Sequence, residues 1–267
     1  MMFKKIAATA FASLLLSGIA QADALQSAID GDHRSDKNSA RDEFRRPYET
    51  LSFFEVKPTN KVVEIWPGGG WYTEILAPFL RDNGQLVAAH FPEQDKEGYF
   101  KRSRDAYLKK LAANPDIYDR VEVTAVHPPE HDKMTAPGTA DNVLTFRNVH
   151  NWTKMGIDQM MFDAFYDALK PGGILGVVEH RAPEDASLEY MKESGYVTEA
   201  YVIDLAKQSG FTLIESSDIN NNAADTKDYE KGVWTLPPTL AMKDKDRERF
   251  VAIGESDRMT LKFVKPE

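Results

Sequence analysis

Residues 62–73 constrain the fold more than any other stretch of the chain. A β-branched run ends in a carboxylate at Glu64, three successive glycines follow at positions 68–70, and a helical pattern begins near Thr73. Glycine has no Cβ, so a ligand can lie directly against the backbone of such a turn. The helix that follows directs its free N–H groups and the positive end of its dipole toward that ligand. The segment therefore predicts a strand–turn–helix unit that suits a nucleotide-like cofactor.

The rest of the chain alternates between strand-like and helix-like segments. Expected strands cover residues 61–66, 85–89, 121–126, 141–146, 174–179, 211–216 and 258–264. Expected helices cover residues 73–80, 99–113, 157–169 and 197–209. Strands that alternate with helices pair in parallel, with helices on both faces of the sheet. We therefore expect a single α/β domain over residues 47–267, built on a mostly parallel, doubly wound sheet.

Two segments lack a clear period. Residues 23–46 are polar and charged, which predicts a mobile or loosely helical lead-in. Residues 218–257 include Trp234 and a charged run from Lys243 to Arg249. A long stretch of this kind inside a domain is often a lid over a binding site. The alternative is an exposed insertion, and the sequence leaves both open.

The first 22 residues have the pattern of an export signal. Two lysines precede an apolar run over residues 6–19, which is too short to cross a bilayer as a mature helix. Residues 20–22, Ala-Gln-Ala, fit a small-x-small cleavage site. We therefore expect a signal peptide over residues 1–22 and a periplasmic or secreted protein with no stable membrane insertion after cleavage. Two alternatives stay open: an uncleaved anchor, and a cytoplasmic enzyme whose first residues mimic a signal.

Charge and cysteine content disfavour several classes of protein. The formal charge is −9, and a net negative surface disfavours non-specific binding to nucleic acids or anionic membranes. There is no cysteine, which excludes disulfides, thiolate metal sites and a cysteine nucleophile. No Gly-x-Ser-x-Gly elbow and no phosphate-binding Gly-Lys-Ser/Thr motif is present, so nothing supports a serine hydrolase or a nucleoside triphosphatase. We expect a small-molecule substrate and no nucleic-acid partner, and the sequence leaves the oligomeric state open.

Two of the histidines have a spacing that is also found among metal ligands. His127 and His131 have the four-residue spacing of a helical metal motif. Pro128 and Pro129 lie between them, and a helix interior cannot form through two prolines. We therefore expect no metal site.

Four motifs give the chain a resemblance to a known family. They are Val-Glu-Ile-Trp-Pro-Gly-Gly-Gly-Trp-Tyr-Thr (63–73), Asp-Asn-Val-Leu-Thr-Phe-Arg-Asn-Val-His-Asn-Trp (141–152), Ala-Leu-Lys-Pro-Gly-Gly-Ile-Leu (168–175) and Glu-His-Arg-Ala (179–182). From about residue 47 onward the chain resembles the class I S-adenosylmethionine-dependent methyltransferases, and in particular a group of exported predicted methyltransferases. The resemblance implies a Rossmann-like, seven-stranded sheet, S-adenosylmethionine as cofactor, and methyl transfer to a small molecule that it does not identify.

The expected location leaves a second function open. S-adenosylmethionine is not expected to be made where an exported protein resides. The chain could then be a catalytically inactive, methyltransferase-like protein that binds another ligand or a partner protein. The intact glycines and Glu64 favour the enzyme.

The resemblance also implies where the cofactor lies. The family pattern places the methionine part of the cofactor beside Glu64 and the three glycines. The family's acidic residue at the end of the second strand, which holds the ribose hydroxyls, is replaced here by His90. A histidine cannot accept both hydroxyl protons as a carboxylate can, so Glu93 is the candidate substitute. The cofactor-binding candidates are Glu64, Gly68, Gly69, Gly70, His90, Glu93 and Asn148.

Residues that end the fourth and fifth strands form the expected acceptor side. In this family the end of the fourth strand faces the transferred methyl group, which places Arg147, Asn148, His150 and Trp152 there. His150 could act as general base because histidine titrates near neutral pH, and packing under the loop is the alternative. Glu179 could hold His180 in one tautomer, although adjacent residues of a strand point to opposite faces. The catalytic candidates are therefore His150, Asn148 and His180.

Overall fold

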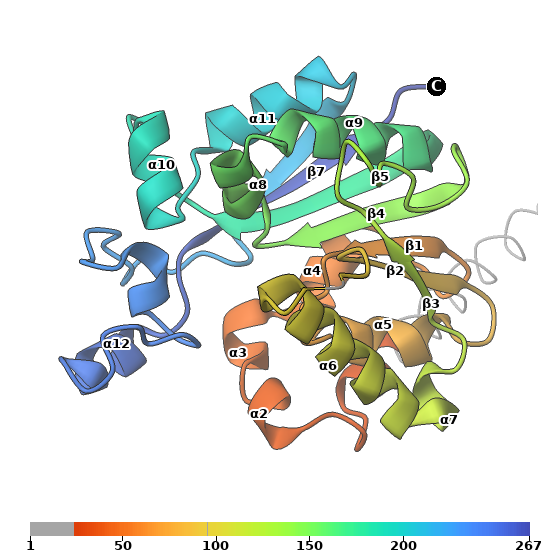
Figure 1. Ribbon diagram of the computed structural model, residues 1–267, viewed down its shortest axis with the longest axis horizontal. Helices are drawn as coiled ribbons and strands as arrows, with labels where there is room; N and C mark the ends of the chain where they lie inside the picture. Colours follow the sequence, from red (N-terminus) through yellow and green to blue (C-terminus); the bar gives the residue numbers. More distant parts are fainter. Residues whose placement is uncertain (1–23, 95) are drawn as a thin grey trace, which may run out of the picture.

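The computed structural model describes residues 24–94 and 96–267, and Figure 1 shows its architecture. One sheet has the strand order β3-β2-β1-β4-β5-β7-β6. The strands are β1 (Lys61–Ile65), β2 (Gln85–His90), β3 (Glu122–Ala125), β4 (Ala140–Phe146), β5 (Leu169–His180), β6 (Thr212–Ser217) and β7 (Arg258–Val264). β7 pairs antiparallel with β5 and β6, and the other neighbouring strands pair in parallel. The expected Rossmann-like, seven-stranded, mostly parallel sheet is therefore confirmed. The expected signal peptide over residues 1–22 lies outside the described residues.

Helices cover both faces of the sheet. Helices α4, α5 and α6 lie on one side, and α8, α9 and α11 lie on the other (Figure 1). The described helices are one over residues 24–29, α2 (Asp36–Ser39), α3 (Asp42–Arg45), α4 (Pro47–Phe53), α5 (Thr73–Leu80), α6 (Tyr99–Ala113), α7 (Pro115–Tyr118), α8 (Val149–Met155), α9 (Asp158–Ala168), α10 (Leu188–Ser194), α11 (Glu199–Gln208), the 3-10 helix η1 (Gly232–Thr235) and α12 (Arg247–Ile253).

The central strand β1 shows why this sequence folds into three layers. Val62 packs in the hydrophobic cluster that α4, α5 and α6 form with the sheet, and Val63 packs in the cluster on the opposite face. Successive strand residues point to opposite faces, so a strand covered by helices on both sides must be apolar at consecutive positions. Strand order reverses between β1 and β4, whose last paired residues are Ile65 and Thr145. This reversal creates a crevice beyond their carboxyl ends.

Most expected elements agree with the structure to within a few residues, and the differences have local causes. β1 ends at Ile65 because Trp66 adopts a left-handed φ of 45°. β5 begins at Leu169, five residues before the expected start at residue 174, because the Gly172 N–H donates to the carbonyl of Lys265 and extends the sheet irregularly. The sequence did not predict α8, whose seven residues are too few to show a helical period.

Both segments without a clear period fold against the rest of the domain. The lead-in forms the helix at 24–29 together with α2 and α3, and Arg45 in α3 is buried, so the structure shows the helical alternative. Residues 218–257 contain η1 and α12, and Val233 and Leu236 are buried. This segment is therefore not a fully exposed insertion. Across residues 24–94 and 96–267, no helix has the length and apolar character needed to cross a membrane.

Candidate functional site

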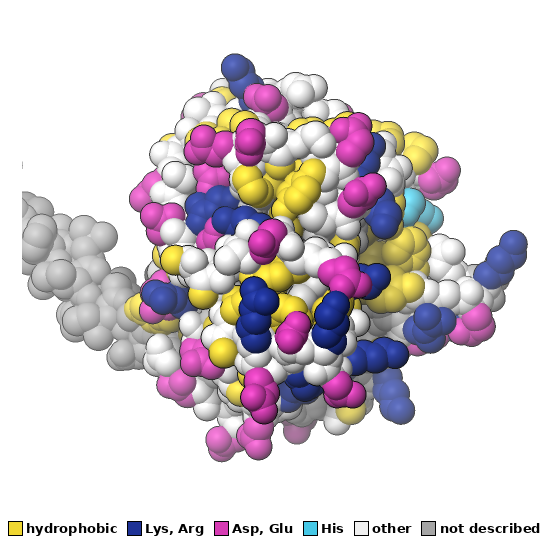
Figure 2. All heavy atoms as spheres, turned by 90° about the vertical axis from the view of Figure 1, so that its left-hand side faces the viewer, with side chains coloured by type: hydrophobic (Ala, Val, Ile, Leu, Met, Phe, Trp, Pro, Cys, Tyr) yellow, Lys and Arg dark blue, Asp and Glu magenta, His cyan; other side chains and the backbone are white. Residues whose placement is uncertain are grey.

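A cavity of about 850 Å³ lies at the carboxyl edge of the sheet, beyond the ends of β1 and β4. Sites for small molecules and cofactors typically have volumes of roughly 300–1,000 Å³ and lie at this point of open α/β sheets. Strand β4 runs toward the left of Figure 1, so Figure 2 shows the carboxyl-edge face, with hydrophobic side chains near its middle and charged side chains around them. The lead-in and the 218–257 segment both contribute to the lining, through Lys37, Asn38, Arg41, Arg45, Val233, Trp234, Pro237, Pro238 and Thr239.

The glycine turn forms one wall of this cavity. Gly68 and Gly69 line it, and a Cβ placed on either would have no heavy atom within 4 Å. Gly70 does not line it, because its Cβ position faces Tyr107 of α6 at 3.1 Å. The Lys110 Nζ donates to the carbonyl of Gly69 at 2.9 Å and so ties the turn to α6. Two of the three predicted glycines therefore present bare backbone to the cavity.

Glu64 lies on the same wall, near the end of β1. Its carboxylate accepts a hydrogen bond from the Thr73 hydroxyl at 2.6 Å, from the first residue of α5. Burial raises the pKa of Glu64 to about 7, and the Thr73 hydrogen bond and the charge of Lys110 only partly oppose this effect. A positive ligand group beside Glu64 would favour its charged form. The predicted position of Glu64 at the cavity is therefore found.

His90 and Glu93 do not line the cavity, contrary to the predicted cofactor set. β2 persists through His90, whose fully buried ring packs against Tyr107 of α6 with ring centroids 5.0 Å apart. Burial lowers the pKa of His90 to about 4, so the ring is neutral at neutral pH. The next residue, Phe91, lines the cavity instead. Glu93 is exposed to solvent.

Aromatic side chains line the cavity near the end of β2, where the sequence suggested polar partners for the ribose. Trp66, Phe91 and Phe100 line the cavity and pack on one another, with ring centroids of Trp66 and Phe91 4.6 Å apart and those of Phe91 and Phe100 4.4 Å apart. The Trp66 indole N–H donates to the Val126 carbonyl at 2.8 Å, which fixes the ring. This wall offers flat apolar surface of the kind on which a heterocyclic base stacks. Trp152, expected near the acceptor, is instead fully buried in the core.

Asn148 connects the ends of two strands at the cavity. Its side-chain amide donates to the Ile65 carbonyl at 2.9 Å and to the Thr145 hydroxyl at 3.3 Å. Asn148 also lines the cavity, directly before α8. The structure therefore gives it a positioning role at the strand reversal, in addition to access to a ligand.

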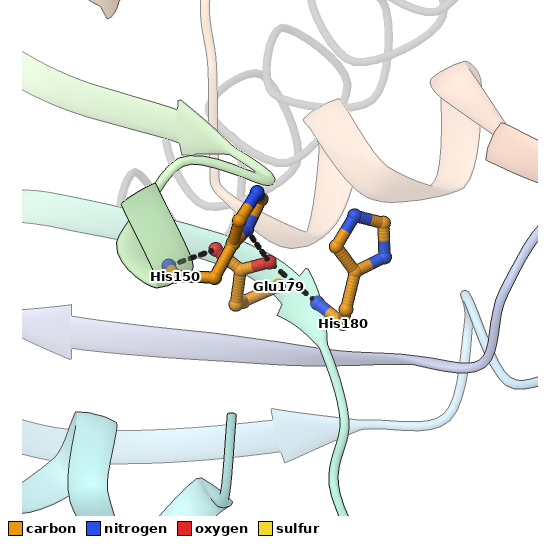
Figure 3. Close-up of side chains that lie close together, drawn as sticks. All are labelled: His150, Glu179 and His180. Carbon is orange, nitrogen blue, oxygen red and sulfur yellow. Dashed lines mark hydrogen bonds and ion pairs between the residues drawn. The ribbon is translucent and has the colours of Figure 1, made fainter. Parts of the chain in front are cut away.

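His150 and Glu179 form a buried pair that the sequence only half predicted. Figure 3 shows His150 from α8 above Glu179 from the end of β5. His150 Nδ1 lies 3.0 Å from Glu179 Oε1, and the backbone N–H of His150 donates to Glu179 Oε2 at 3.3 Å. A carboxylate at Nδ1 favours the tautomer with a proton on that nitrogen, which leaves Nε2 free to accept a proton. Glu179 thus orients His150, not His180 as the sequence suggested.

His180 is the second imidazole at the cavity. Its Nδ1 lies 2.6 Å from the Ser256 hydroxyl, and the rings of His150 and His180 have centroids 5.2 Å apart. Burial, and then the positive charges of neighbours led by His150, lower the pKa of His180 well below its usual range. Ligand atoms of these two histidines and Glu179 lie within 4.8 Å of one another, so the trio could hold a metal ion if its hydrogen bonds were exchanged for metal bonds.

The other histidines of interest in the sequence lie elsewhere. His127 and His131 form an isolated antiparallel bridge, with backbone hydrogen bonds in both directions. The prediction that no helix places them on one face is therefore confirmed. His127 stacks on Trp66 from outside the cavity lining, and His131 is exposed.

Three arginines lie on the cavity wall, and the sequence pointed to only one of them, Arg147. Arg41 and Arg45 come from the lead-in, and Arg147 follows β4 with a left-handed φ of 62°. Burial alone would raise the pKa of Glu255, but four arginines, which include these three, lower it to about 2. The only hint of Arg41 and Arg45 in the sequence was the density of arginines in residues 41–46, which we interpreted as part of a mobile or loosely helical lead-in.

Comparison with known proteins bears on the fold. No family model and no curated protein matches the sequence. An S-adenosylmethionine-dependent methyltransferase of Aquifex aeolicus is similar with a TM-score of 0.53 and 17% identity, over 68% of this chain and 87% of that one. The [4+2]-cyclase SpnF is similar with a TM-score of 0.57 and 14% identity, over 94% and 95% of the two chains.

A third similar structure contains a ligand. It is phosphoethanolamine N-methyltransferase 2 of Haemonchus contortus, in complex with phosphomonomethylethanolamine and S-adenosylhomocysteine, at a TM-score of 0.55 and 18% identity over 84% of this chain and 53% of that one. The fold is thus the Rossmann-like fold of the class I S-adenosylmethionine-dependent methyltransferases. At these identities the likeness establishes the fold alone.

Proposed function

We propose that the protein is an S-adenosylmethionine-dependent methyltransferase that acts on a small molecule. The observation that carries the proposal is the bare backbone of Gly68 and Gly69 beside the buried carboxylate of Glu64, at the strand reversal of a methyltransferase fold. A cavity of about 850 Å³ has room for a small acceptor beside a nucleoside-sized cofactor.

The lining residues fit this cofactor. Glu64 would attract the positively charged groups of the cofactor. The bare backbone of the glycine turn would lie along the cofactor, and Trp66 and Phe91 would stack with its base. Bound there, S-adenosylmethionine would supply a methyl group on a positively charged sulfur. Because no carboxylate of the described chain lines the cavity at the end of β2, the ribose would depend on contacts other than the family's usual acidic residue.

The protein itself contributes to the reaction in two ways: it positions the reacting groups, and it accepts a proton. His150 Nε2 would take the proton of the acceptor group, while Glu179 at 3.0 Å from Nδ1 holds the ring and stabilises the imidazolium that forms. Asn148 keeps the ends of β1 and β4 in place through its bond to Ile65. Such positioning accounts for much of the rate of a displacement reaction.

Calorimetric titration with S-adenosylmethionine tests the cofactor proposal, with a matched pair of valine variants. Gly69→Val places a branched side chain in the open space of the cavity, and we expect binding at least roughly a hundredfold weaker. Gly98→Val is the control, because its Cβ also meets open space but Gly98 lies off the cavity. Equal affinity of the two variants would place the cofactor elsewhere. A parent protein that binds no S-adenosylmethionine at millimolar concentration would instead support the inactive binding protein.

We also propose that the protein is exported and that residues 1–22 are removed. The support is the basic start, the apolar run and the Ala-Gln-Ala segment of the sequence. Sequencing the N-terminus of the protein from fractionated cells tests this proposal. A chain that begins at Asp23 in the periplasm or medium would support it, and an intact Met1 in the cytoplasm would exclude it.

A further inference from the structure

We propose that Arg41, Arg45 and Arg147 form an oxyanion site in the cavity, and that it binds a carboxylate or phosphate group of the acceptor. The claim that the bound anion belongs to the acceptor rests on the proposed methyltransferase function. The claim that the arginines form an oxyanion site does not. All three arginines line the cavity. They come from α3 and its preceding residue and from the loop after β4, so the fold brings them together from distant parts of the chain.

The arginines outnumber the acidic groups that face them. Glu255 is the carboxylate that contacts them: its oxygens lie 2.6 Å from Arg41 Nε, 3.2 Å from Arg45 Nε and 4.0 Å from Arg147 Nη1. The same carboxylate also pairs with Arg258 at 3.1 Å. Among the described residues, one negative charge therefore faces four guanidinium groups. Because guanidinium groups stay protonated in proteins, the excess positive charge can be balanced only by an anion or by solvent.

Two guanidinium nitrogens in this group have no hydrogen-bond partner within residues 24–94 and 96–267. They are Arg41 Nη2 and Arg45 Nη2, and both atoms are buried. Arg45 is 1% exposed, and its guanidinium lies over the Trp71 ring at 4.6 Å from the centroid. A buried donor that lacks a partner costs free energy, and such groups usually mark a site for a ligand or a water molecule. A planar guanidinium with free donors suits bidentate binding of a carboxylate or phosphate.

The surroundings connect this site to the proposed reaction. Arg147 and Arg45 are close enough to His180 for their charges to contribute to its lowered pKa. His180 and His150 line the same cavity. An acidic group held by the arginines would therefore anchor a small molecule whose other end lies near the two imidazoles. The same chemistry could come from the carboxylate of the cofactor's methionine part, and the experiment separates the two sources.

The test uses Arg147→Gln and the double variant Arg41→Gln/Arg147→Gln. The Arg147 side chain is 25% exposed and only distantly paired, and Arg45 and Arg258 still neutralise Glu255 in both variants. Arg46→Gln is the matched control. Arg46 has a left-handed φ of 39°, as Arg147 has one of 62°, but it is exposed and does not line the cavity. Melting temperatures without ligand verify that each variant folds.

The first measurement uses thermal shift to determine the affinity for inorganic phosphate at low ionic strength. We expect phosphate to stabilise the parent and Arg46→Gln, and its affinity to fall roughly tenfold or more in the Arg147→Gln and double variants, as expected for loss of a charge-assisted hydrogen bond. Equal phosphate affinity in parent, control and both cavity variants would overturn the oxyanion site. This measurement needs no cofactor, so its result stands even if the parent fails to bind S-adenosylmethionine and the proposed function falls.

The second measurement assigns the source of the anion. Calorimetry compares S-adenosylmethionine with its decarboxylated form in the parent and in Arg147→Gln. Unchanged affinity of the variant for both compounds, together with lost phosphate binding, supports the acceptor as source. A loss for S-adenosylmethionine alone would assign the arginines to the cofactor's carboxylate and overturn the anionic acceptor.

Discussion

The two walls of the cavity differ in chemistry and in origin. The wall of β1 and β2 offers bare backbone at Gly68 and Gly69, the aromatic rings of Trp66 and Phe91, and one carboxylate, Glu64. The second wall, which meets the first where Arg45 lies over the Trp71 ring, offers arginines and imidazoles and no acidic side chain among its lining residues in the described chain. One wall is thus suited to a flat ligand with positive charge, and the other to a negatively charged group and a proton.

This difference indicates a division of labour within one cavity. Residues 62–73 build most of the first wall, so its geometry is set by a local strand–turn–helix unit. The second wall is assembled from the lead-in, the end of β4, the end of β5 and η1, and it depends on the whole fold. Changes on the first wall should therefore alter cofactor binding, and changes on the second should alter turnover or acceptor binding.

The largest expected effect on turnover comes from His150→Ala. Removal of the general base should slow methyl transfer by roughly a hundredfold or more, while affinity for S-adenosylmethionine stays the same, because His150 lies on the second wall. The measurement is the rate of S-adenosylhomocysteine formation with the acceptor that copurifies from cells, together with calorimetry. His131→Ala, an exposed histidine off the cavity, is the control. Parental turnover in His150→Ala would assign His150 to packing of α8.

An effect of about tenfold is expected from the pH dependence of cofactor affinity. Burial raises the pKa of Glu64 to about 7, so the carboxyl group of the free protein is mostly protonated at about pH 6 and mostly ionised at about pH 8. A cationic cofactor needs the ionised form, so affinity should rise about tenfold over this range and then level off. Calorimetry across pH with Glu64→Gln as comparison tests this. The variant should show no such rise, and a pH-independent affinity of the parent would separate Glu64 from the cofactor.

The smallest effect on the ligand is expected at His90. His90→Ala should change affinity for S-adenosylmethionine only slightly, because its side chain packs against Tyr107 and touches the cavity lining only through the backbone of Gly68. Chemical denaturation should nevertheless show a loss of about 0.5–3 kcal/mol in the free energy of unfolding, since a buried ring is removed. Phe91→Ala, one residue on, should weaken binding because Phe91 lines the cavity. If His90→Ala weakened binding more than Phe91→Ala, the assignment of this strand end would be wrong.

The sequence predicted the fold and the first wall for the same physical reason. Apolar runs covered on both faces, together with a glycine turn before Thr73, determine strand, turn and helix locally, and Glu64 follows from its place at the end of that strand. The replacement of an acid by His90 was recognised from the sequence. The direction of its side chain was not, because it depends on where β2 ends and on packing against α6.

The second wall was predicted only in part. His150 and His180 were expected at strand ends, and the structure places both at the cavity. The partner of Glu179 was not predictable, because it depends on α8, a helix too short to show a period. Arg41 and Arg45 lie in a polar segment whose charges suggest solvent exposure. Arg45 is nevertheless buried and Arg41 partly buried, and both pair with Glu255, which is 214 residues from Arg41 and 210 residues from Arg45 in the chain.

A crystal structure with S-adenosylhomocysteine is the most direct measurement of how the first wall is used. We expect the ligand to lie against the backbone of Gly68 and Gly69, with its base on Trp66 and Phe91 and its amino-acid part near Glu64. A structure in which the compound is absent at saturating concentration, or is bound away from this turn, would contradict the proposed cofactor site.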